Sequence, residues 1–203
     1  PVGNSWGNLT ISTGGTKTLS GANTVRGALT LNAGTLAPGA GSLTMASGSK
    51  IVRTNTDLSG IMTAAVGGGN PYAIEYQGAT SKVINASGAS TEFNGAGTKT
   101  LILNLTAATL TLDATRTLGD SLVINSGSTL ADAGFTLNVN KNISNSGDHT
   151  GTGKIVLTGG AAVHDVYGSG SGTFTNLELN DANNATMTAD SMTINGTLTL
   201  TTG

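Results

Sequence analysis

The side chains that could do chemistry in this 203-residue chain are few: 11 residues are acidic, two are histidines and none is a cysteine. The closest acidic cluster is Asp113 and Asp120, with Asp132 further along the chain. Two carboxylates on one face can cleave a glycosidic bond. Asp113 and Asp120, however, bracket the stretch Ala114 to Gly119, which is typical of a turn. We therefore expect these residues at corners of the fold rather than in an active site.

The two histidines also lack a catalytic or metal-binding context. His149 follows Asp148 and His164 precedes Asp165, but spacing alone gives no Ser-His-Asp arrangement. HExxH and EF-hand patterns are absent from the sequence. The Gly-Gly pairs lack the Asp that follows in calcium-binding nonapeptide repeats. The sequence therefore predicts no enzyme, no metal ion and no cofactor.

A glycine-rich stretch, Val66 to Pro71, adjoins the densest aromatic patch of the chain. It has no Lys-Ser/Thr tail, so it is not a phosphate-binding P-loop. We expect residues 61–72 to form a loop excursion from the main body. Tyr72 and Tyr76 follow, and on an exposed surface the two rings could contact a glycan. The alternative is that both rings fill a widened part of the interior.

Composition excludes several other classes. Gly, Thr, Asn and Ser make up half of the chain, and charged residues only 10%. Nine Lys and Arg with a net charge of -2 give no basic surface for nucleic acid. No apolar run approaches the roughly 20 residues of a membrane-spanning helix. Partners are therefore expected among proteins or glycans, not nucleic acid.

One short phrase recurs along the chain. A small or polar residue comes first, then Leu or Met, then a polar residue, usually Thr, and then an aliphatic residue. This alternation is the period of a half-buried β-strand, and turn-forming residues follow each copy. The copies begin at Asn8, Ala28, Ser42, Ser121, Asn176, Ser191 and Thr197.

A stack of coils explains these phrases better than a two-sheet sandwich, because a sandwich of this length usually needs more than seven aromatic residues in its core. We predict an all-β fold, a right-handed parallel β-helix (β-solenoid) with irregular coils of roughly 20–25 residues. Residues 1–203 form a single segment with no clear end caps. The residues expected in the structural core are Leu9, Ile11, Leu29, Leu31, Leu122, Ile124, Leu177, Leu179, Leu198 and Leu200.

Several phrases of the sequence resemble repeats of a known group of proteins. GTLTL, NSGDHTGTGKIVLTGG, GSGTFTNLELNDAN and IEYQGAT are similar to repeats of very long surface proteins of Bacteroidota, which are exported by type IX secretion and include gliding and adhesion filaments. Phrases of the GTLTLNAGTL kind also resemble passenger repeats of autotransporter adhesins. Both resemblances imply an extracellular or cell-surface β-solenoid and neither implies an enzyme. The triplets that begin with Asp120-Ser121 and Asp190-Ser191 resemble the O-glycosylation pattern of that phylum; otherwise Ser121 and Ser191 simply begin strands.

The expected function is therefore structural or adhesive: a stiff stalk or filament on the bacterial surface, which continues into a longer chain or assembles with itself. One alternative is a binding module for a surface glycan or for ice. Ice binding needs Thr-x-Thr pairs at a constant offset per coil, and pairs such as Thr16/Thr18, Thr54/Thr56 and Thr109/Thr111 share no period. A second alternative is a polysaccharide-active β-helix enzyme, which needs converging carboxylates.

Overall fold

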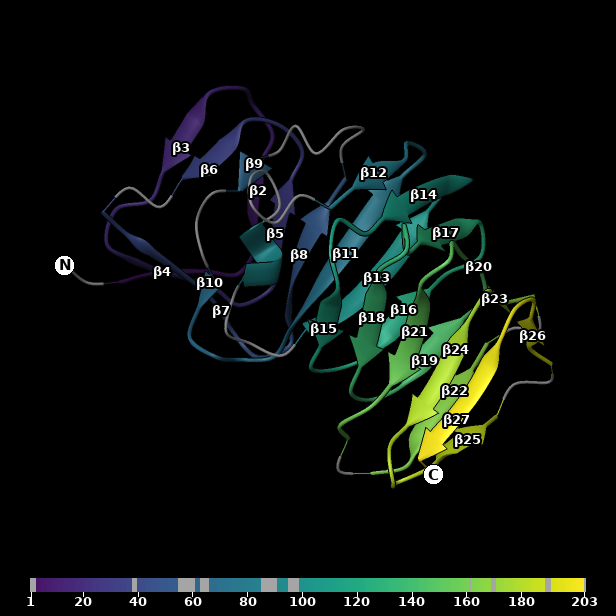
Figure 1. The fold of residues 1–203 in the computed structure, drawn as a ribbon. Coiled ribbons are helices and arrows are strands. Elements are labelled where there is room, and N and C mark those ends of the chain that lie inside the picture. Colours follow the sequence, from purple (N-terminus) through teal and green to yellow (C-terminus); the bar gives the residue numbers. More distant parts are fainter. Residues whose placement is uncertain are drawn as a thin grey trace.

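The computed structural model describes residues 3–37, 40–54, 61–62, 66–84, 91–94, 99–160, 162–168, 171–188 and 191–202. Its strands form five sheets, and each sheet is built from parallel pairs. The chain winds as stacked coils from the purple to the yellow end in Figure 1. The predicted all-β parallel β-helix is thus confirmed: the fold is a β-solenoid.

One side of the solenoid, sheet B, runs through every coil. Equivalent inward positions on this side start at Leu9, Leu29 and Ile51, and successive ones are 20 to 27 residues apart. The longest step, from Ile74 to Leu101, exceeds the predicted coil length. The nine strands of sheet B are β2 (Leu9–Ile11), β5 (Ala28–Leu31), β8 (Ser49–Arg53), β11 (Tyr72–Gly78), β13 (Lys99–Leu105), β16 (Leu122–Ile124), β19 (Ile143–Asn145), β22 (His164–Tyr167) and β25 (Ala185–Met187).

The other two sides are each divided between an N-terminal and a C-terminal sheet. The strands that precede sheet B in each coil form sheet A, then sheet E. Sheet A contains β1 (Asn4–Trp6), β4 (Ala22–Val25), β7 (Ser42–Met45) and β10 (Val66–Gly67). Sheet E contains β15 (Arg116–Leu118), β18 (Thr136–Val139), β21 (Lys154–Leu157), β24 (Leu177–Asn180) and β27 (Leu198–Thr202).

The strands that follow sheet B form sheet C and then sheet D. Sheet C contains β3 (Thr16–Thr18), β6 (Thr35–Ala37) and β9 (Ile61–Met62). Sheet D contains β12 (Lys82–Val83), β14 (Ala108–Thr111), β17 (Ser128–Ala131), β20 (Asp148–Thr150), β23 (Thr173–Phe174) and β26 (Thr193–Ile194). Between the two halves, the residues described between β12 and β13 form a 3-10 turn, η1 (Thr91–Asn94), the teal coil in Figure 1, where the neighbouring coils have a strand of sheet A or sheet E. We call the coils around η1 the junction.

The recurring sequence phrase has a structural cause at the corner before a strand. The Asn8 Oδ1 atom accepts a hydrogen bond from the Ala28 amide at 2.8 Å, one coil later. Asn176 Oδ1 does the same for the Thr197 amide at 3.0 Å. In both places the next coil carries a glycine before that amide, and a Cβ on Gly27 would lie only 2.3 Å from Asn8 Oδ1. The pattern of Asn before one strand and Gly before its copy is thus a hydrogen-bonded corner.

The core is a narrow column of aliphatic side chains inside the coils. Burial of such side chains is the main stabilising contribution in a fold with this few aromatics. Six of the ten predicted core residues are buried: Ile11, Leu29, Leu31, Leu122, Ile124 and Leu177. Leu9 and Leu179 are partly buried and pack against the same column.

Two of the predicted core residues lie elsewhere. Leu198 and Leu200 are 51% and 72% exposed. Both keep the register of the column, because they pair with Leu177 and Leu179. Their strand β27 is the edge of sheet E, so no described strand covers them on the far side. The alternation predicted their register correctly and their burial wrongly.

The stretch 61–72, expected to leave the stack, is largely part of it. Ile61–Met62 pairs with β6, and Val66–Gly67 pairs with β7. Tyr72 already belongs to sheet B. Gly67 therefore ends a paired strand, and Gly68 and Gly69 lie at the corner that follows it rather than in an excursion. Among the described residues, no helix has the length and apolar character required to cross a membrane.

Candidate functional site

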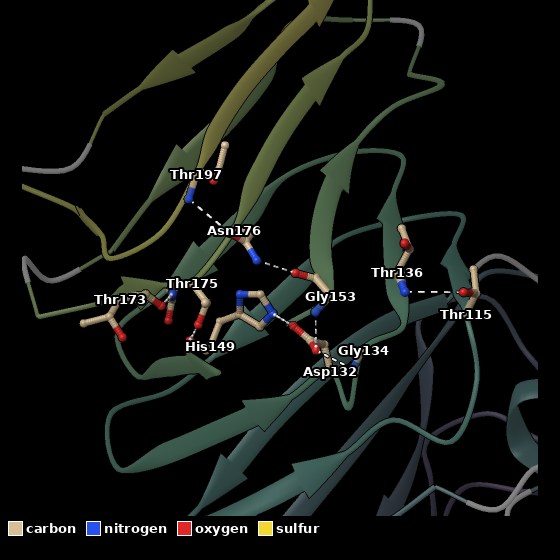
Figure 2. Close-up of polar contacts among 11 residues, drawn as sticks. Thr115, Asp132, Gly134, Thr136, His149, Gly153, Thr173, Thr175, Asn176 and Thr197 are labelled. Atoms are coloured by element: carbon tan, nitrogen blue, oxygen red, sulfur yellow. Dashed lines mark hydrogen bonds and ion pairs between the residues drawn. The ribbon is translucent and has the colours of Figure 1, made fainter. Parts of the chain in front are cut away.

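The most complete polar cluster of the C-terminal half is a buried aspartate–histidine pair, drawn in Figure 2. Asp132 Oδ2 lies 2.9 Å from His149 Nε2, and both side chains are fully buried. The other carboxylate oxygen, Oδ1, accepts the backbone N–H groups of Gly134 and Gly153, each at 2.8 Å. The Asp132 carboxylate therefore links its own turn to the strand of His149 and to the turn of Gly153, both in the next coil.

Local sequence explains why Asp132 reaches these partners. It follows β17 directly, and the chain then turns through Ala133 and Gly134, both at positive φ (52° and 87°). An Asp that begins such a turn readily accepts the N–H two residues on. His149 is the inward residue of β20, where it pairs with Leu130 of β17. The turn and the strand pleat thus place the carboxylate and the imidazole on the same inner corner.

Two glycines of the next coil leave room for the carboxylate. A Cβ on Gly151 would lie 2.2 Å from Asp132 Oδ1, and φ at Gly151 is +120°. A Cβ on Gly153 would lie 1.9 Å from the backbone oxygen of Phe135. The segment Gly151-Thr152-Gly153 is therefore part of the cluster, because larger residues would push the coils apart.

Burial of the His149 ring favours its neutral form. Burial lowers the pKa of His149 below its ordinary value of 6.5, and the attraction and hydrogen bond of Asp132 offset this only in part. Since the carboxylate accepts, Nε2 carries the proton and donates it. Nδ1 has no hydrogen-bond partner. With both side chains out of contact with solvent, the pair cannot act on a substrate from outside; it fastens coils together.

A second aspartate–histidine pair lies nearer the C-terminus. Asp181 Oδ2 accepts the Gly160 amide at 2.7 Å, and Oδ1 accepts the Asn183 amide at 2.8 Å. These bonds hold the pKa of Asp181 well below its usual range. His164 Nε2 lies 3.2 Å from Asp181 Oδ2, and His164 Nδ1 lies 2.5 Å from the backbone oxygen of Lys141. The same three kinds of partner recur: a turn amide, a glycine amide of the neighbouring coil and a buried histidine.

The junction holds a third buried polar cluster, inside the coil where η1 replaces a strand. Arg53 Nε lies 3.3 Å from Glu92 Oε1, with both side chains almost fully buried. Tyr76 donates its hydroxyl to the same oxygen at 3.1 Å. Tyr72 donates to the Glu92 backbone oxygen at 2.6 Å. Burial raises the pKa of Glu92, against the opposing effect of Arg53. The contacts of Arg53, Tyr72 and Tyr76 with Glu92 hold η1 in the interior.

This arrangement excludes a glycan contact of Tyr72 and Tyr76 and agrees with the alternative stated above, in which both rings fill the interior. They are only 3% and 0% exposed, so neither ring offers a face on which a sugar could stack. Lys99 lies over the Tyr72 ring, 5.6 Å from its centroid, on the inside of the coil. The tyrosines instead fill the interior at the junction and place their hydroxyls on η1.

The acidic residues noticed first do not converge on one another. Asp113 binds Arg116 at 2.6 Å and Asp120 binds Lys141 at 2.9 Å, so each carboxylate has its own cation. Among the described residues, no group of three or more His, Asp or Glu could hold a metal ion. Asp132, the third of the series, belongs to the buried pair with His149.

The two serines of the glycosylation pattern differ in their surroundings. Ser121 is half-buried, donates its hydroxyl to Asp120 at 3.0 Å and precedes β16. Ser191 is exposed just before β26, and its neighbour Asp190 lies outside the described residues. Nothing in these contacts tests glycosylation.

Sequence reasoning missed the pairing of Asp132 with His149 and of His164 with Asp181. Each pair is separated by 17 residues, and each glycine partner lies 21 residues from its aspartate. The separation of 21 residues is about the length of one coil, and the separation of 17 residues is one coil less a turn. A search for Asp at a strand end with His and Gly about one coil away would have found both.

No protein-family model, curated protein or solved structure matches the chain. The site is therefore interpreted from its own geometry.

Proposed function

We propose that this chain is a structural segment of an extracellular β-solenoid that forms a stiff stalk or filament on a bacterial surface. The observation that carries the proposal is sheet B, whose nine parallel strands run through every coil over one aliphatic column. Hydrogen bonds between coils lie along the axis of such a stack, so stretching the rod must break many of them together. The buried polar clusters described above fasten corners and leave no accessible reaction centre among them.

Stiffness is tested by pulling the chain between two flanking handle domains in a single-molecule force experiment. We expect cooperative unfolding of several coils at once. Leu122→Asp should remove that resistance, since Leu122 is fully buried and an unpaired buried charge is very costly. Leu200→Asp is the matched control, because Leu200 is 72% exposed. Equal behaviour of the two variants would contradict a load-resisting aliphatic column.

Location is tested separately with antibodies raised against this chain. Labelling of intact cells, and its loss after mild external protease treatment, is expected for a surface stalk. Labelling only after lysis would contradict the extracellular part of the proposal. The mass of the native polypeptide then separates a slice of a long stalk from a small subunit that assembles with itself.

A second candidate, ice binding, is favoured by the outer face of sheet D. Pairing across coils aligns Thr109, Thr129, Asp148, Thr173 and Thr193 in one row. These residues are unevenly spaced in the sequence, but they still pair in register because the difference in spacing lies at the corners. Hydroxyls on such a row repeat about every 4.8 Å across strands, a spacing close to a lattice repeat of ice. Asp148 interrupts the row.

Ice recrystallisation and thermal hysteresis measured on the purified chain test this candidate. Thr129→Tyr should abolish any activity, because it places a bulky ring in the middle of the row. Thr117→Tyr, on the exposed face of sheet E, should leave the activity unchanged. Absence of activity in the wild-type chain rejects ice binding and leaves the structural proposal untouched.

A further inference from the structure

One ring nitrogen of His149, Nδ1, could accept a proton, but it has no hydrogen-bond partner for the N–H group that would form. Its Nε2 donates to Asp132 Oδ2 at 2.9 Å, while Nδ1 is buried without a partner. Phe174 of the next coil packs edge-on against the ring, with centroids 6.3 Å apart. A proton added at Nδ1 would therefore create a buried N–H group that faces apolar surroundings.

The groups around the ring offer little compensation. On the strand before, β17, the neighbour is Leu130, and on the strand after, β23, it is Phe174. Among the described residues, the charged group that faces the ring is Asp132, which already accepts three hydrogen bonds. An unsatisfied buried donor and an added charge both favour exposure to water. The ring can gain a proton and keep it solvated only if the corner opens.

We propose that His149 is a proton-sensitive lock, which holds the corner of Asp132, Gly134 and Gly153 closed while the imidazole is neutral and releases it when the ring is protonated. This goes beyond a passive rod, because mild acid would loosen the coils from β17 to β23 without loosening the junction. The direction follows from linkage. The unfolded or open chain binds the proton near the ordinary value of 6.5, whereas burial lowers the pKa of His149 in the closed corner. Stability of the closed form is therefore full above that value and falls as the pH decreases below it.

His164 supplies a built-in contrast. Its Nδ1 lies 2.5 Å from the Lys141 backbone oxygen and its Nε2 lies 3.2 Å from Asp181 Oδ2. His164 Nε2 makes no hydrogen bond but still lies beside a carboxylate oxygen, whereas the ion-pair contact of His149 is made by Nε2 and leaves Nδ1 with neither kind of partner. The lock is assigned to His149 because its unbonded nitrogen has no carboxylate beside it.

Hydrogen exchange of the Gly134 and Gly153 amides, followed by NMR, reports the opening directly, because both amides donate to Asp132. Protection factors in the wild-type chain should fall from about pH 7.5 to about pH 5, by up to about tenfold for each unit of pH below the ordinary His value. His149→Gln should remove this dependence, since its amide cannot take up the proton. His164→Gln is the matched control and should keep the wild-type dependence.

The proposal is overturned if wild-type protection is independent of pH, or if His149→Gln shows the same dependence as the wild type. Should His149→Gln fail to fold, nitrogen chemical shifts of the wild-type imidazole decide instead. The lock requires that Nδ1 becomes protonated only where the Gly134 and Gly153 amides lose protection. A ring that protonates while both amides stay protected would refute it.

Discussion

Two buried polar centres of this solenoid, one at the junction and one at a corner of the C-terminal half, have different structural roles. At the junction, Arg53 and Glu92 meet where a strand is replaced by η1, and tyrosine hydroxyls supply the remaining bonds. At the corner of the C-terminal half, Asp132 and His149 satisfy turn amides in an otherwise regular stack. The first centre holds a break in the repeat together, and the second maintains the repeat. Their side chains should therefore respond differently to mutation and to acid.

The largest effect is expected from Glu92→Ala. Removal of the carboxylate takes away the acidic group that lies 3.3 Å from the buried Arg53 guanidinium. We expect a loss of about 3–5 kcal/mol in the free energy of unfolding, measured by denaturant titration. The double variant Arg53→Met with Glu92→Leu should recover most of it, because apolar residues can replace a buried ion pair. A Glu92→Ala variant as stable as the wild type would show that the pair does not hold η1.

Asp132→Ala should rank second. It leaves the amides of Gly134 and Gly153 and the imidazole of His149 without their acceptor, and an unsatisfied buried donor costs about 1–3 kcal/mol. The same change at Asp181 should cost less, since Asp181 lies in the last coils, where β25 and β27 are edge strands. Thermal unfolding of the two variants side by side measures the difference. Equal losses would mean that position in the stack does not matter.

Much of the architecture could be predicted from the sequence, and the polar interior could not. The alternation at Leu29, Leu122 and Ile124 is local, so it indicated both strand and inward face. Asp132 and His149 contact each other across two neighbouring coils, and the length of a coil varies here from 20 to 27 residues. Alternation within one strand therefore does not indicate this pair, and only a search at a separation of about one coil does.

The junction was harder still to predict. The sequence left two positions open for Tyr72 and Tyr76, an exposed surface beside the glycine-rich stretch and the interior of a widened coil. Their burial depends on Glu92, which lies in a segment without the repeated phrase and enters the interior as a 3-10 turn. Where a repeat is interrupted, side-chain position is decided by tertiary packing rather than by periodicity. Prediction by alternation therefore fails at the junction and succeeds in the coils on either side.

Gly153→Ala should have a moderate effect that is specific to the corner. Its Cβ would lie 1.9 Å from the Phe135 backbone oxygen, so the two coils must separate. Overpacking of this kind typically costs about 1–3 kcal/mol. Gly14→Ala is the control, because nothing lies within 4 Å of the added Cβ. A comparable loss of melting temperature in both variants would indicate a general effect of glycine replacement instead of a tight corner.

The smallest effect, and the sharpest comparison, is the sign of the response to acid. Burial raises the pKa of Glu92 above its ordinary value of 4.5, so the folded state binds this proton more readily than the unfolded state. The stabilisation from Glu92 is therefore full below 4.5 and is lost as the pH rises through the folded pKa. Burial lowers the pKa of His149, so its contribution has the opposite slope.

Unfolding free energies of the wild type, Glu92→Gln and His149→Gln, measured across the range from about pH 7.5 to about pH 5, test both slopes together. As the pH falls, the wild type should gain stability relative to Glu92→Gln and lose it relative to His149→Gln. Slopes of the same sign would mean that the two centres share one electrostatic environment. Opposite slopes would show that acid tightens the break in the repeat while it loosens the repeat itself.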